Sequence, residues 1–79
     1  MKKFSRKKLK DEIMREARVL NMHSGAAEMI ADKVVEKVGK WADKRTEVTR
    51  EDLNRMTAKA LEEFDGDLAY VYKNRGKII

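Results

Sequence analysis

Apolar residues recur every three or four positions in the first part of the chain, with polar residues between them. Over residues 5–20 this stripe consists of Leu9, Ile13, Ala17 and Leu20. The spacing places apolar side chains on one face and predicts an amphipathic α-helix over residues 5–20. Ser5 is suited to cap its start, because a hydroxyl can accept from a free backbone N–H group, and Phe4 can pack on Leu9.

A wider apolar stripe over residues 24–42 is the strongest core signal in the sequence. The segment before it, residues 21–25, breaks the period, and Ser24 is in position to cap the new helix. The stripe predicts a helix over residues 24–42 whose core face carries Ala27, Ile30, Ala31, Val34, Val35, Val38 and Trp41.

Two further helices are predicted in the second half of the chain. Thr49, followed three residues later by Asp52, resembles a capping box and starts a helix over residues 49–64. Gly66 is suited to a left-handed C-terminal cap, and a short helix over residues 67–74 follows. The core faces of these helices are expected to carry Leu53, Met56, Thr57, Ala60, Leu61 and Phe64, then Leu68, Val71 and Tyr72.

These segments predict an all-α fold for one domain spanning residues 1–79, a compact bundle of three longer helices and a short C-terminal helix. The loops are short, so neighbouring helices should run roughly antiparallel, with the starts of the first and third helices at one end. Apolar runs are too short to cross a bilayer and cysteine is absent. We expect a soluble, cytoplasmic protein that does not enter the membrane.

Charge is distributed unevenly along the chain. Residues 1–10 hold six basic residues and no acids, residues 11–72 hold ten basic residues and fourteen acids, and residues 73–79 add three basic residues. This asymmetry favours an anionic partner that meets both ends of the chain, provided that the fold brings them together. Terminal lysines that serve only solubility are the alternative.

The chemistry for catalysis is not evident. The one histidine, His23, lies in a predicted loop, and the four glycines are isolated from one another. We therefore expect neither an enzyme nor a metal site. The aromatic residues Trp41, Phe64, Tyr70 and Tyr72 are interpreted as core or rim residues first and as stacking surfaces for a base second. On the predicted second helix, Glu28, Asp32 and Glu36 with Lys33, Lys37 and Lys40 are interpreted as a solvated helix face.

A helix N-terminus with basic residues beside it can bind an anion, because free amides, a hydroxyl and cationic groups can all face phosphate oxygens. The opening turn supplies such a terminus, and Thr49 supplies a second one. The predicted phosphate-binding residues are Ser5, Arg6, Lys7, Lys8, Thr49, Lys73 and Arg75.

The order of these motifs resembles the helical part of ATP-cone domains. Phe4 to Leu9 is similar to the phrase that opens the family's first helix, Val48-Thr49 with Asp52-Leu53 to its third, and residues 67–75 to its closing segment. The family's N-terminal β-hairpin, whose turn grips the nucleotide, has no counterpart in residues 1–79. The resemblance implies that Ser5, Lys8, Thr49 and Arg75 match the nucleotide contacts.

The resemblance implies a small non-catalytic regulatory or adaptor domain that binds a phosphorylated ligand, with ATP or dATP as effector rather than cofactor. A helical nucleic-acid-binding protein that uses its basic termini is the second hypothesis. The third is a ligand-free protein interaction module with exposed methionines. The first hypothesis requires the opening turn and Arg75 to converge on one phosphate group.

Overall fold

The computed structural model describes residues 5–74, which form an all-α bundle, as the periodicity predicts. Its helices are α1 (Arg6–Val19), α2 (Ser24–Asp43), α3 (Arg50–Glu62) and α4 (Gly66–Asn74). Each begins and ends within two residues of the bounds that the sequence predicts. Phe4, Arg75, Gly76 and the C-terminal isoleucines lie outside the described residues. Within residues 5–74, no helix combines the length and the apolar character that crossing a bilayer requires.

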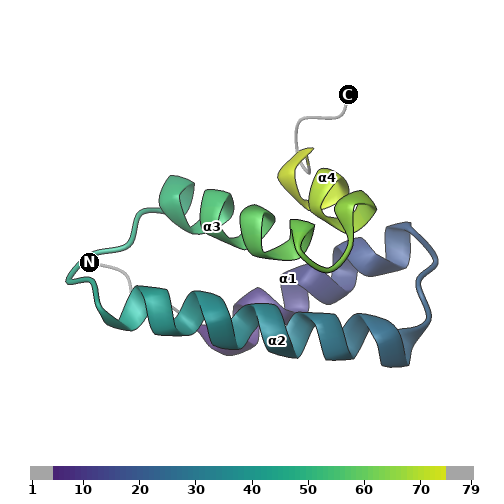
Figure 1. The fold of residues 1–79 in the computed structure, drawn as a ribbon, viewed down its shortest axis with the longest axis horizontal. Helices are drawn as coiled ribbons and strands as arrows, with labels where there is room; N and C mark the ends of the chain where they lie inside the picture. Colours follow the sequence, from purple (N-terminus) through teal and green to yellow (C-terminus); the bar gives the residue numbers. More distant parts are fainter. Residues whose placement is uncertain (1–4, 75–79) are drawn as a thin grey trace.

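The long helix α2 is one of four helices that each contact two others. It contacts α1 and α3, while α4 packs on α3 and on α1. Figure 1 shows α2 and α3 running in opposite directions, with α1 crossing behind α2 and the short α4 above α1. The starts of α1 and α3 lie at the same end as the C-terminus of α2, as the short loops predict.

Residues from all four helices build one hydrophobic core. Its largest fully buried side chains are Leu9 and Ile13 of α1, Val34 and Val38 of α2, Leu61 of α3, and Leu68 and Tyr72 of α4. Burying each such side chain stabilises the fold by roughly 1.5–3 kcal/mol. The same apolar stripes that predict the helices therefore also hold them together.

Glu12 joins three helices at the edge of the core. Its Oε1 accepts a hydrogen bond from the buried Tyr72 hydroxyl of α4 at 3.3 Å. Its Oε2 accepts from Nη1 of Arg50 of α3, also at 3.3 Å. The Glu12 side chain is only 23% exposed, so these polar contacts are partly shielded from water. They fix α3 and α4 relative to α1.

The helix caps follow the sequence at two of three expected positions. Ser5 Oγ accepts from the backbone N–H of Lys8 at 3.2 Å, and Thr49 Oγ1 accepts from that of Asp52 at 3.0 Å. The prediction that Ser24 caps α2 is wrong, because Ser24 is already helical and His23 Nδ1 accepts from the Gly25 N–H at 3.1 Å.

The chain reversals also differ from the sequence expectation. Gly66 is not a left-handed cap; it is the first residue of α4, and Asp65 Oδ1 accepts from the backbone N–H groups of Asp67 and Leu68. The left-handed residue is Asn21, with φ of 57°, where the chain leaves α1. Because Asp65 restarts the helix at once, Phe64 is turned outward and is 42% exposed rather than in the core.

Arg6 lies across the C-terminal part of α2. A methyl group built on Gly39 would come within 2.5 Å of the Arg6 guanidinium, so the absence of a side chain there makes room for it. Arg6 Nη2 then reaches Asp43 Oδ2 at 3.0 Å. A carboxylate in the last turn of a helix opposes the helix dipole, and Arg6 offsets that effect.

Thr57 is fully buried, and its Oγ1 has no hydrogen-bond partner among the described residues. Leaving a buried hydroxyl unpaired costs roughly 1–3 kcal/mol. Thr57→Val keeps the shape and should raise the free energy of unfolding by about 1 kcal/mol in urea denaturation. Thr57→Ser, the control, keeps the hydroxyl, loses a methyl group and should be destabilising. Loss of stability in the valine variant would show that the hydroxyl has a partner.

Gly39→Ala tests the contact with Arg6 in a double-mutant cycle. Alanine favours a helix interior over glycine by roughly 1 kcal/mol. In an Arg6→Gln background, Gly39→Ala should raise the free energy of unfolding by that full amount, measured by urea unfolding. With Arg6 present the gain should be smaller, because the methyl group displaces the guanidinium and its exposed ion pair, which is worth about 0–1 kcal/mol. Equal gains in both backgrounds would contradict the contact.

Candidate anion-binding site

Most of the positive charge in the opening turn of α1 is paired with carboxylates of the protein itself. Arg6 is paired with Asp43, and Lys7 Nζ lies 3.7 Å from Asp11 Oδ2. Among the described residues, Lys8 is the one cation of this turn without an ion-pair partner. The Ser5 hydroxyl is engaged as the cap. The structure thus gathers Ser5, Arg6, Lys7 and Lys8 in one turn, but only Lys8 offers an uncommitted charge there.

The other predicted phosphate-binding residues stand on other elements. Thr49 caps α3, whose first turn carries the acids Glu51 and Asp52, and these already complement the positive helix end. Lys73 is exposed in the last turn of α4. That turn reaches α1 at Glu12, two helical turns beyond Ser5. No hydrogen bond or ion pair joins Lys73 to the opening turn within residues 5–74, and Arg75 lies outside the described residues.

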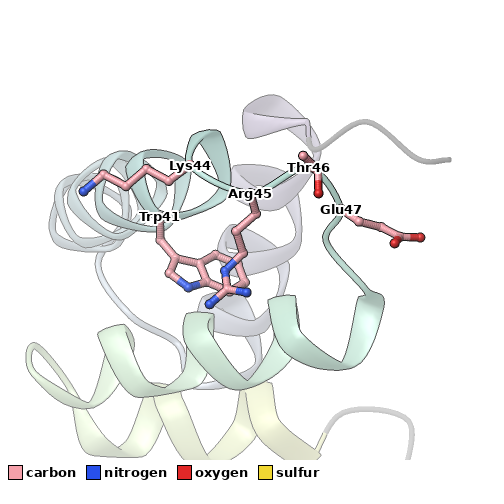
Figure 2. A pocket seen from close by; sticks show the side chains of 5 residues that line it. All are labelled: Trp41, Lys44, Arg45, Thr46 and Glu47. Atoms are coloured by element: carbon pink, nitrogen blue, oxygen red, sulfur yellow. The ribbon is translucent and has the colours of Figure 1, made fainter.

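A hollow that sequence reasoning missed lies where α2 ends. Its lining consists of Trp41, Lys44, Arg45, Thr46 and Glu47, and its volume is about 440 Å³. Figure 2 shows Trp41 and Arg45 pointing to the same side, toward α3, while Lys44 points away from them. The guanidinium carbon of Arg45 stands 4.8 Å from the centre of the Trp41 ring. The hollow therefore combines an aromatic surface, two cations, a hydroxyl and the carboxylate of Glu47.

A second hollow adjoins the first and shares Trp41 and Lys44 with it. It lies between α2 and α3 and has a volume of about 490 Å³. Three lysines of α2 and Lys44, its C-cap residue, line it at spacings of four, three and four residues, which keeps them on one side of the helix over about 16 Å. We call this set the lysine row; its members are Lys33, Lys37, Lys40 and Lys44.

The lysine row is only partly neutralised. Lys37 pairs with Glu63 of α3, and Lys40 Nζ lies 3.8 Å from Glu36 Oε2. Lys33 and Lys44 have no ion-pair partner among the described residues. Together the two hollows are lined by five cations and two carboxylates. The helix dipole accounts for basic residues in the last turn of α2, but not for Lys33, which lies more than two turns before its end.

Two acids of α2, Glu28 and Asp32, face α1 instead. Lys10 of α1 lies 3.3 Å from Glu28 Oε2 and 2.9 Å from Asp32 Oδ1. Hydrogen bonds to Asp32 and then to Glu28 raise the pKa of Lys10 above its usual value. The face interpreted from the sequence as mixed and solvated is therefore divided, with Glu28 and Asp32 toward α1 and the lysines toward α3, where Glu36 accompanies them. In the sequence, the spacing of the four lysines indicates the side of the helix that turns toward α3.

Within residues 5–74, no group of three or more His, Cys, Asp and Glu side chains is placed to hold a metal ion. His23, the single histidine, serves as the cap of α2. Comparisons with protein-family models, curated proteins and solved structures gave no match for this chain. The resemblance to ATP-cone domains stays a prediction.

Proposed function

We propose that this protein is a non-catalytic domain that binds a phosphorylated ligand of the nucleotide class and acts as a regulatory or adaptor module. The observation that carries the proposal is the hollow at the end of α2, where Trp41 stands beside Lys44 and Arg45. An aromatic face suits a base, and cations suit phosphate oxygens. The resemblance to ATP-cone domains supports ATP or dATP as the ligand to test first.

The energies of the competing contacts favour a base on Trp41. Arg45 now covers the indole ring, and an exposed contact of this kind is worth roughly 0.5–1 kcal/mol. Stacking a base on an aromatic side chain is worth about 1–3 kcal/mol. A base can therefore take the place of the guanidinium at a net gain, and Arg45 then becomes free to meet a phosphate group. Thr46 offers a hydroxyl at the same hollow.

The opening turn of α1 is the competing location for the phosphate group. A phosphate there would meet Lys8 and the Ser5 hydroxyl, but a second cation would come only by attracting Arg6 or Lys7 away from its carboxylate partner. The hollow beside Trp41 requires only the exchange of one exposed stacking contact. We therefore place the ligand at the hollow and treat Lys8 as the test residue for the other location.

Titration with ATP and with dATP, followed through the fluorescence of Trp41 and by calorimetry, tests the proposal. Trp41 is the single tryptophan, so a stacked base should quench its emission directly. Arg45→Gln should weaken binding at least about tenfold, because a hydrogen bond between charged groups contributes roughly 1.5–3 kcal/mol. Arg15→Gln makes the same substitution at an exposed position on α1 and should leave binding unchanged.

Two results would contradict the placement or the function. Binding that is lost in Lys8→Ala and kept in Arg45→Gln would assign the ligand to the opening turn. Absence of both heat and fluorescence change with either nucleotide, in folded protein, would overturn the proposal that the domain binds nucleotides.

A further inference from the structure

The lysine row continues the hollow at Trp41 into a longer positive surface. Both hollows share Trp41 and Lys44, and the row runs from Lys44 back along α2 to Lys33. The phosphates of a free nucleotide are attached to one another and would meet only the end of the row nearest Trp41. Lys33 and Lys37 would then have no role in binding, although they line the same surface.

From this continuity we infer that the ligand is a single-stranded nucleic acid, with one base stacked on Trp41 and its backbone following the lysine row. The inference rests on the proposed function, since it also requires a base on Trp41. Stacked nucleotides rise about 3.4 Å each along a strand, so the row of about 16 Å matches four to five of them. A polyanion of this length uses every lysine of the row.

The strand is single because the aromatic surface requires an unpaired base. The faces of the bases in a duplex are covered by their neighbours, whereas an unpaired base can turn and stack on an aromatic side chain. Trp41 is half-buried in the wall of the hollow and packs against the core, so it can receive a base but cannot extend into a duplex.

The existing ion pairs of the lysine row do not prevent a nucleic-acid strand from binding along it. Lys37 and Glu63 are each 55% exposed, and Lys40 and Glu36 are more exposed still. Exposed pairs of this kind are worth about 0–1 kcal/mol. Each phosphate that meets a lysine instead releases condensed counterions from the nucleic acid, which favours binding at low and moderate salt.

Fluorescence anisotropy with a labelled eight-residue thymidine oligonucleotide tests the inference. The oligonucleotide should bind more tightly than thymidine monophosphate, and the logarithm of its binding constant should fall with the logarithm of salt concentration with a slope of about −3, as expected for four phosphate contacts. Lys33→Gln should weaken binding of the oligonucleotide and reduce the slope by about 0.7, while leaving mononucleotide binding at Trp41 unchanged. Arg15→Gln is the matched control at an exposed cation outside the row.

An oligonucleotide of the same length with abasic sites separates stacking from charge without altering the protein. It should bind about tenfold more weakly than the thymidine strand, because it keeps the phosphates and lacks the bases. A duplex of equal length should also bind more weakly. Equal affinity for the thymidine, abasic and duplex probes would overturn the inference and indicate a surface that responds to charge alone.

The outcomes separate the two proposals. If ATP quenches Trp41 but the thymidine strand binds no more tightly than its mononucleotide, the inference fails and the proposed function stands. If neither nucleotides nor the strand bind, both fail. Tighter strand binding that depends on Lys33 and on the bases supports both.

Discussion

The fold depends on α2, a helix that must bury one face and divide its charges between the other two sides. Its apolar stripe packs between α1 and α3, so that Val34 and Val38 are fully enclosed. The polar residues are left on the flanks, and the 3.6-residue period decides which flank each one occupies. Glu28 and Asp32 fall on the side where α1 supplies Lys10. The lysine row falls on the other side, where Glu36 is the one acid of α2 beside it among the described residues, so packing the core also separates most of the charges.

The same packing explains why the opening turn is less available to a ligand than its composition suggests. Crossing α1 over α2 brings Arg6 to Gly39 and within reach of Asp43. A cation that looks free in the sequence is thereby used between two helices. At the opposite flank α3 supplies Glu63 to the lysine row but no partner for Lys33 or Lys44 among the described residues. Lys8 is therefore the one uncommitted cation of the opening turn, whereas the lysine row beside Trp41 keeps two, Lys33 and Lys44, among the described residues.

Local patterns predicted the helices because those patterns are local in origin. Apolar spacing and the hydroxyls of Ser5 and Thr49 act within a few residues, and the structure confirms both caps. The candidate hollow depends on how α2 meets α3, which no single segment encodes. The lysine spacing is present in the sequence, but acidic residues are interleaved with it. Only the packing of α1 on α2 shows that Glu28 and Asp32 pair with Lys10 and lie on the side of α2 away from the lysine row. The errors at Ser24, Gly66 and Phe64 arose where a neighbouring residue, His23 or Asp65, made the competing hydrogen bond.

The contact between Tyr72 and Glu12 has a consequence for how the chain assembles. The other helix pairs in contact follow one another along the chain, and such neighbours meet rapidly because little loop entropy opposes them. Docking α4 onto α1 instead joins residues 60 positions apart. We therefore expect this closure to be the late event in folding, after the pairs of consecutive helices have formed, among them α1–α2 with its left-handed Asn21 reversal.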